Sequence, residues 1–223
     1  MTIVSAQNLY KTYQRGKIAF EALRGVSFDI NPGEFTVLVG PSGSGKTTLL
    51  NLIGCLDKPT SGAIYLNGKA LHDLNELQLA KERNQNLGFI FQTFNLIPVL
   101  SALENVEFPL LIRKMSQAER QRRAELWMRE MGLETFRSHK PGELSGGQQQ
   151  RVAIARALIG DPKLVLADEP TANLDSATGD SIIALMKRLN QEKGITFLLS
   201  THDEKIIHYA SRIIHLLDGK IAS

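Results

Sequence analysis

Long apolar stretches are missing from this chain of 223 residues. No run approaches the roughly 18 apolar residues that a helix needs to cross a bilayer. The first residues also lack the basic segment and apolar stretch of a secretory signal. If the protein serves a membrane process, we therefore expect another chain to cross the membrane.

Cysteine is nearly absent as well. Cys55 is the only one, so an internal disulfide is excluded, which fits a reducing compartment. Because Cys55 follows a predicted helix, we expect it to be a buried structural thiol.

A large excess of one charge is missing too. The chain has 26 Lys and Arg against 23 Asp and Glu, a net charge of +3. The densest basic run holds Arg120, Arg122 and Arg123, but Glu119 and Glu125 are interleaved with it. This pattern indicates a solvated helix face, and we expect no nucleic-acid partner.

What the chain does have is alternation. Short strand-like runs alternate with helical patterns, which favours an α/β fold with a mostly parallel sheet. We predict core strands at 34–39, 87–91, 164–167, 196–200 and 212–217, and helices at 46–53, 117–131, 149–159 and 176–191.

Two regions depart from this alternation. Runs at 3–9, 26–30 and 63–66, the last followed by the turn Asn67-Gly68, predict an antiparallel β subdomain. The segment 95–141 is predicted to be a helical subdomain inserted into the core, and its long helix starts at a capping box, Ser116 to Glu119. We treat 1–223 as a single domain, whose helical part also includes the region after 141.

A complete phosphate-binding loop lies between the first core strand and its helix. It fits G-x-x-x-x-G-K-[ST] and consists of Gly40, Pro41, Ser42, Gly43, Ser44, Gly45, Lys46 and Thr47, with Thr48 next to it. Glycines let successive N–H groups face one anion, and the helix N-terminus adds partial positive charge. We expect Lys46 to reach the β- and γ-phosphates and the Thr47 hydroxyl to bind Mg²⁺.

Two acids follow the apolar strand at 164–167. Asp168 closes that strand, where a carboxylate can meet Mg²⁺ directly or through water. Glu169 is one residue further, as a general base for the attacking water would be. By themselves, two such acids could equally cap a helix, but the phosphate loop favours the catalytic interpretation.

A second glycine-rich segment, Leu144-Ser145-Gly146-Gly147-Gln148, is far from the phosphate loop in sequence. Its backbone amides offer the same anion-binding chemistry. One nucleotide cannot easily use both segments of one chain, so the pattern points to a site shared between two chains. Gln92 and His202 follow two other strands and are expected at the sheet edge where α/β proteins bind ligands.

These motifs together resemble the ATP-binding-cassette ATPases over essentially the whole chain. They occur in the family's order, and the joint match is far more specific than any one motif. The resemblance implies a P-loop NTPase core, ATP and Mg²⁺ as cofactors, and a head-to-tail dimer around two ATP molecules.

The resemblance also implies roles for single residues. Tyr13 stacks on adenine, with Tyr10 as a rival that fits the family position less well. Gln92 links Mg²⁺ and the attacking water to the transporter interface, and His202 contacts the γ-phosphate. Asp175 lies at the dimer interface. The ATP held by the partner chain is bound by Ser145, Gly146, Gly147 and Gln148.

Weaker motifs resemble the branch that contains lipoprotein-release and macrolide-export ATPases. They are the segments 53–62, 88–92, 95–98, 104–106 and the triple Gln at 148–150. The apolar segment 94–100 is either a groove for a permease helix or ordinary core packing of the helical subdomain. Residues 198–200, before Thr201-His202, match no one substrate group.

We therefore predict an ATPase subunit that drives a separate membrane permease in export, lipoprotein extraction or mechanotransmission. Glu169 activates water, while Lys46, Mg²⁺ and His202 stabilise charge on the γ-phosphate. The subunit is expected at the cytoplasmic face of the inner membrane, held there by its permease.

Three alternatives fit less well. Cassette ATPases of DNA repair or chromosome structure carry a long coiled coil between the two nucleotide motifs, and no such heptads are present. Ribosome-associated cassette proteins carry two cassettes in one chain. A simple P-loop kinase leaves LSGGQ unexplained.

Overall fold

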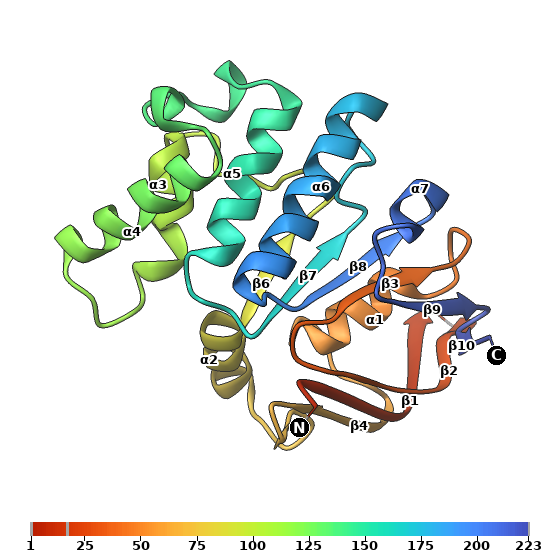
Figure 1. The fold of residues 1–223 in the computed structure, drawn as a ribbon. Helices are drawn as coiled ribbons and strands as arrows, with labels where there is room; N and C mark the ends of the chain where they lie inside the picture. Colours follow the sequence, from red (N-terminus) through yellow and green to blue (C-terminus); the bar gives the residue numbers. More distant parts are fainter. Residues whose placement is uncertain (1, 17, 223) are drawn as a thin grey trace.

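A six-stranded sheet forms the centre of the molecule (Figure 1). The computed structural model describes residues 2–16 and 18–222. The strand order is β10-β9-β3-β8-β7-β6, and the pairs are parallel except β9 with β10. The strands are β3 (Phe35–Val39), β6 (Leu87–Ile90), β7 (Leu164–Asp168), β8 (Phe197–Thr201), β9 (Arg212–Leu217) and β10 (Lys220–Ile221).

Alternate residues of these strands enter two different cores, because successive side chains of a strand point to opposite faces. Val37, Ala167 and Leu199 join the core formed with α5 (Gly146–Leu158) and α6 (Ser176–Lys193). Leu38 and Leu198 join the other core, with α1 (Lys46–Ile53) and the second sheet. Helices therefore cover both faces, which explains why the central strands read as continuous apolar runs.

The second sheet is antiparallel, as the sequence predicts, with the order β2-β1-β4-β5. Its strands are β1 (Val4–Arg15), β2 (Ile18–Ile30), β4 (Ser61–Leu66) and β5 (Lys69–Ala70). The predicted turn between β4 and β5 is present, with φ of 54° at Asn67 and 79° at Gly68. β1 and β2 are much longer than predicted, because exposed residues extend both strands beyond their apolar parts.

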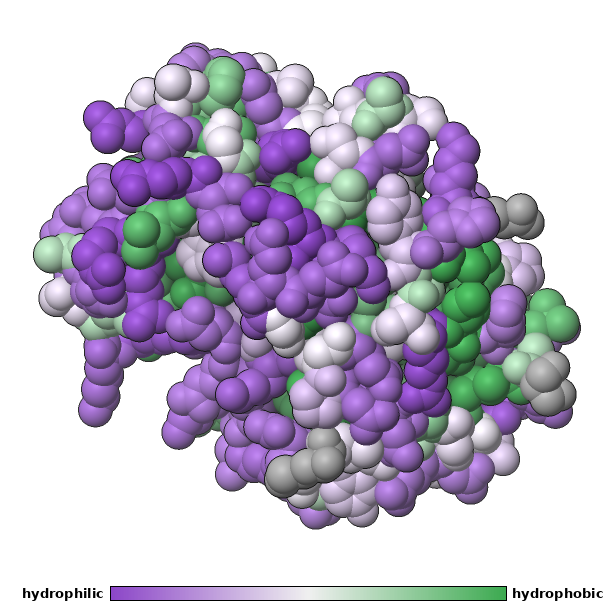
Figure 2. All heavy atoms as spheres, in the orientation of Figure 1, coloured by the Kyte–Doolittle hydropathy of each residue, from purple (hydrophilic) through white to green (hydrophobic). Residues whose placement is uncertain are grey.

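Short helices fill the segment between β6 and α5. They are α3 (Ala102–Glu107), the 3-10 turns at Phe108–Leu110, Glu134–Phe136 and Pro141–Glu143, and α4 (Gln117–Glu130). Val106, Ala124 and Met128 are fully buried and join the core that α5 shares with the sheet. The outer face over α4, α5 and α6 is mostly hydrophilic (Figure 2), as expected for amphipathic helices. Every helix in the described ranges is too short or too polar to cross a membrane.

The predicted capping box of α4 forms only in part. Ser116 Oγ accepts a hydrogen bond from the Glu119 N–H at 3.3 Å. The Glu119 carboxylate turns instead to the guanidinium groups of Arg122 and Arg123, and these hydrogen bonds lower its pKa to about 2. Three charge-assisted bonds from two arginines compete with one bond to a backbone amide, so the second half of the box is lost. The sequence also failed to predict α2 (Glu76–Asn86) and α7 (Glu204–Ile207).

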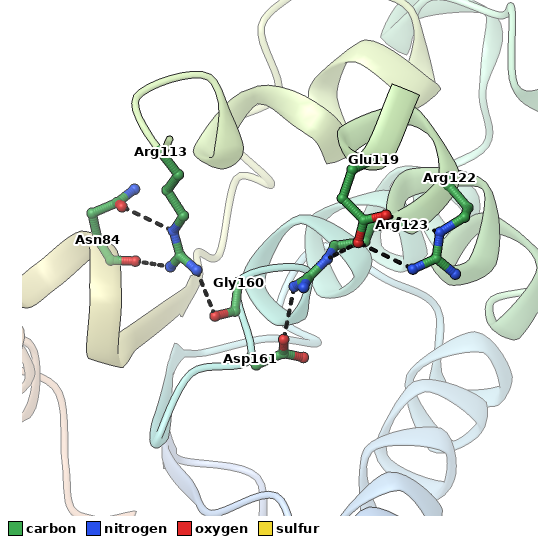
Figure 3. A network of polar contacts seen from close by, with 7 residues as sticks. All are labelled: Asn84, Arg113, Glu119, Arg122, Arg123, Gly160 and Asp161. Carbon is green, nitrogen blue, oxygen red and sulfur yellow. Dashed lines mark hydrogen bonds and ion pairs between the residues drawn. The ribbon is translucent and has the colours of Figure 1, made fainter. Parts of the chain in front are cut away.

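A polar network ties α2, α4 and the loop after α5 together (Figure 3). Arg113 Nε donates to Asn84 Oδ1 at 3.1 Å and Nη1 donates to the Gly160 carbonyl at 2.9 Å. Arg113 Nη2 also bonds the Asn84 carbonyl. Close by, Arg123 pairs with Asp161 at 2.9 Å. One planar guanidinium thus satisfies acceptors on two elements that are far apart in the chain.

Replacing Arg113 by Ala is expected to lower the free energy of unfolding by roughly 1–3 kcal/mol, because two carbonyls and one amide lose a charged donor. Arg113→Lys should recover only part of this, since an ammonium lacks the fork that meets both carbonyls. Arg122→Ala is the control: its pair with Glu119 is exposed, and stability should stay unchanged within error. Urea unfolding followed by circular dichroism measures all three; equal curves for the two Ala variants would contradict the role of Arg113.

Candidate active site

A pocket of about 330 Å³ opens where β3 and β7 end. Parallel strands bring residues from distant parts of the chain to this one edge. The pocket is lined by Phe20, Ala22, Ser42, Gly43, Gly45, Lys46, Thr47, Thr48, Gln92, Asp168 and Glu169.

The loop from β3 to α1 needs glycine at two bends. Gly43 has a φ of 80°, and Gly45, the N-cap of α1, has a φ of 105°, a region that L side chains rarely adopt. A Cβ on Gly45 would also lie 2.7 Å from the Ala22 carbonyl oxygen and 2.9 Å from Leu23 Cδ2. β2 therefore holds the loop so closely that only glycine fits, and the N-terminus of α1 faces the pocket.

Lys46 is almost buried, with 7% of its surface exposed. Its ammonium donates to the carbonyl oxygens of Gly40 at 2.7 Å and Pro41 at 3.0 Å. The Ser44 hydroxyl is buried beneath the loop and has no hydrogen-bond partner in the described part of the chain. The pocket is therefore lined by Ser42, Gly43 and Thr48 of this region. It is not lined by Gly40, Pro41 or Ser44.

Thr47 and Asp168 meet across the pocket. Thr47 Oγ1 lies 3.0 Å from Asp168 Oδ2. Asp168 Oδ1 accepts a hydrogen bond from Ser200 Oγ at 2.5 Å. Sequence reasoning missed Ser200, because a serine near the end of a strand gives no signal of which residue pairs with it on the neighbouring strand.

Glu169 and His202 lie in direct contact. His202 Nδ1 is 2.6 Å from Glu169 Oε2, with 68% of the His202 side chain exposed against 18% of that of Glu169. The backbone of Glu169 has a φ of 49°, so the chain turns sharply after β7. Gln150, from α5, donates to the carbonyl of Pro170 directly after this turn.

The signature segment forms a separate group and does not line this pocket. Ser145 caps α5, and its Oγ accepts from the Gln148 N–H while the Gln148 side chain accepts from the Ser145 N–H. A Cβ on Gly146 would lie 3.1 Å from Leu174, and one on Gly147 would lie 2.6 Å from Thr178. LSGGQ therefore packs beside the start of α6.

Asp175 belongs to the same group. It caps α6, and Asp175 Oδ1 accepts from the Thr178 N–H at 3.0 Å. Hydrogen bonds from Thr178 lower the pKa of Asp175, so this carboxylate stays charged. Asn173 links the signature segment and Asp175 to the residues of the pocket, because its Nδ2 donates to the backbone carbonyl of Gln92 at 2.9 Å.

Tyr13, on β1, is not among the residues that line the pocket. Its hydroxyl donates to Asp57 Oδ2 at 2.9 Å, and Lys11 Nζ lies 4.8 Å from its ring centroid. Burial raises the pKa of Tyr13. Phe20 pairs directly with Tyr13 across β1 and β2, which places both rings on one face of the sheet. Phe20 is 57% exposed and lines the pocket, although nothing in its sequence context predicts this.

A glycine-rich loop between a parallel strand and a helix, with its lysine and an acid on a neighbouring strand, defines a P-loop nucleotide-binding protein. A family profile described as ABC transporter matches residues 23–172. The chain therefore belongs to the ABC transporter family, and it is an ATPase of that family.

Relatives support this membership. ABC transporter ATP-binding protein MJ0796 of Methanocaldococcus jannaschii is 50% identical over 98% of this chain and 95% of that protein. The macrolide export ATP-binding/permease protein MacB of Syntrophobacter fumaroxidans is 48% identical over 99% of this chain, which matches 31% of that longer protein.

Solved structures agree with the fold. A dimeric structure of MJ0796 in a post-hydrolysis state with ADP and phosphate has a TM-score of 0.90 at 50% identity, over 99% of this chain and 97% of that one. The protein cbiO1 of Clostridium perfringens, part of the transporter complex cbiONQ, has a TM-score of 0.89 at 31% identity, over 100% of this chain and 87% of that one. The predicted α/β fold with its antiparallel and helical parts is confirmed.

Gly45→Ala is expected to weaken ATP binding by about tenfold or more, because the new methyl group meets β2 and displaces the loop. Gly68→Ala is the matched control: its φ of 79° brings similar backbone strain, yet no atom lies within 4 Å of the new Cβ and the turn is outside the pocket. Titration with a fluorescent ATP analogue measures both affinities. Equal affinities in the two folded variants would contradict the packing argument.

Proposed function

We propose that two copies of this chain sandwich two ATP molecules head to tail, and that hydrolysis drives a separate membrane permease. The separation of the two glycine-rich segments carries this proposal. The phosphate loop lines the pocket, whereas Ser145 to Gln148 pack beside α6 and do not line it. Two solved structures of the relative MJ0796 are dimeric, which supports a dimer for this chain.

The residues of the pocket suit hydrolysis of ATP. Lys46 hydrogen-bonds the β- and γ-phosphates of ATP. The backbone amides of Gly43 to Thr48 surround the negative charge of these phosphates. Glu169 orients or deprotonates the water that attacks the γ-phosphorus, and the bond to the β-phosphate oxygen breaks to give ADP and phosphate. His202, already in contact with Glu169, contacts the γ-phosphate. Tyr13 stacks on adenine, and Asp175 lies at the dimer interface.

The donors beside Lys46 suit Mg²⁺. Thr47 Oγ1 and Asp168 Oδ2 are hard oxygen atoms 3.0 Å apart, and Gln92 lines the same pocket. Within the described ranges, no group of three or more His, Cys, Asp and Glu could hold a metal. Mg²⁺ is usually held by one or two protein oxygens together with phosphates and water, so this sparse set fits. When bound, the ion neutralises charge on the β- and γ-phosphates.

The same proposal places the subunit at the cytoplasmic face of the inner membrane, held by its permease. The segment 94–100 is the candidate contact: Val99 is 74% exposed, and Arg156 fixes the backbone by hydrogen bonds to the carbonyls of Phe94 and Asn95. We also propose that residues 1–223 act as one domain, with 95–141 and the signature region as its helical subdomain. The similarity to the macrolide export protein MacB favours export.

Glu169→Gln is expected to lower turnover by about 10²- to 10⁴-fold, because the amide cannot accept the proton of the attacking water. ATP binding should persist, and the dimer should accumulate. Phosphate release and sedimentation with ATP measure the two effects. Loss of ATP binding in a folded variant would overturn the assignment of Glu169.

Mixed dimers test the shared site directly. Lys46→Ala and Ser145→Arg should each be inactive alone, because one removes the phosphate contact and the other fills the partner's half-site. When the two variants are mixed, one of the two sites in a mixed dimer has an intact Lys46 and an intact Ser145, so phosphate release should reappear.

The control carries both substitutions in one chain. Mixed with the wild type, this double variant leaves no intact site in a mixed dimer and should only inhibit. Two results argue against a site built from two chains: no inhibition of the wild type by the double variant despite their association, or no activity in the first mixture despite ATP-driven association.

A further inference from the structure

Ser200 is a buried polar side chain that directly follows the apolar part of its strand. It lies in β8, is 0% exposed, and follows Leu198 and Leu199, which are equally buried. A buried hydroxyl needs hydrogen-bond partners. Those of Ser200 are the two acids at the end of β7, because the register pairs Asp168 with Ser200.

The Ser200 hydroxyl connects these two acids. It donates to Asp168 Oδ1 at 2.5 Å and accepts from the Glu169 N–H at 3.2 Å. The one hydrogen of the hydroxyl is thus donated to the Asp168 carboxylate. One of its lone pairs accepts the backbone N–H of Glu169.

The first bond fixes the orientation of the carboxylate. Asp168 Oδ1 accepts from Ser200, and Thr47 Oγ1 lies 3.0 Å from Asp168 Oδ2 and 3.3 Å from Oδ1. A carboxylate rotates freely about its last torsion unless a partner selects one orientation. The hydroxyl therefore selects the orientation of the carboxylate in which Oδ2 is the oxygen nearer to Thr47.

The second bond supports the turn that carries Glu169. The Glu169 N–H is shared between the Ser200 carbonyl at 3.1 Å and the Ser200 hydroxyl. A φ of 49° is unfavourable for a residue with a side chain, so the turn persists only where its surroundings fix it. Ser200 supplies two acceptors at this point.

We propose that Ser200 is a positioning residue for ATP hydrolysis: it orients Asp168 toward the metal and holds the backbone of Glu169. The proposal rests on the assignment of Asp168 as the Mg²⁺ ligand. Residues that orient metal ligands from behind typically affect metal affinity or activity by 10- to 100-fold when they are replaced.

The experiment compares Ser200→Ala and Ser200→Thr with the wild type. For Ser200→Ala, the Mg²⁺ concentration that gives half-maximal phosphate release should rise on the order of tenfold, with a lower maximal rate. Ser200→Thr keeps the hydroxyl and should recover most of both values. ATP-analogue binding in EDTA should be unchanged, because no metal takes part.

Direct metal binding is measured separately from activity. Paramagnetic resonance of Mn²⁺ with a non-hydrolysable ATP analogue should show weaker binding in Ser200→Ala than in the wild type. If the wild type binds Mn²⁺ with nucleotide but shows no ATPase activity, the proposed function fails while this measurement still tests Ser200.

Thr36→Val is the matched control. Thr36 is buried on the neighbouring strand β3, and its hydroxyl also donates to a carboxylate, Glu34 Oε2 at 3.2 Å, but at the other end of the sheet. The variant should lose stability without any change in metal dependence. If Ser200→Ala does not fold, Ser200→Cys keeps the shape with a weak donor and should show an intermediate loss. Unchanged Mg²⁺ and Mn²⁺ affinity in folded Ser200→Ala, or in Ser200→Cys where Ser200→Ala does not fold, overturns the proposal.

Discussion

The register of the parallel strands β3, β8 and β7 is the constraint on which the site depends. It pairs Val39 with Thr201 and Asp168 with Ser200, so that three loops start at one level of the sheet. These loops are the phosphate loop after β3, the turn that carries Glu169 after β7, and the segment that carries His202 after β8. If one strand slipped by one residue against its neighbour, every side chain of that strand would point to the opposite face of the sheet.

Burial on both faces maintains this register. Each central strand contributes to two cores, one with α5 and α6 and one with α1 and the antiparallel sheet. Because the packing is dense on both sides, the ends of the strands are held where the catalytic geometry needs them. Two hydrogen bonds then fix single groups near the strand ends. Ser200 donates to Asp168, and Gln150 donates to the carbonyl of Pro170.

Local motifs were predictable from the sequence, and contacts between distant strands were not. The bounds of α1 were predicted without error, because the phosphate loop fixes where the helix begins. Asp168 and Glu169, which line the pocket, could be selected from the sequence because they follow an apolar run. Phe20 and Ser200 escaped notice, since their importance comes from pairing with Tyr13 and Asp168 across strands. The capping box at Ser116 was half wrong because nearby arginines compete for Glu119.

The position of the signature segment beside α6 has a consequence for control of the ATPase. In the proposed dimer, a lone copy holds ATP without a complete catalytic site, so hydrolysis depends on encounters between two copies. A permease that binds both copies raises their effective concentration and makes closure intramolecular. Free subunits would then hydrolyse little ATP, and ATP hydrolysis would be confined to assembled transporters.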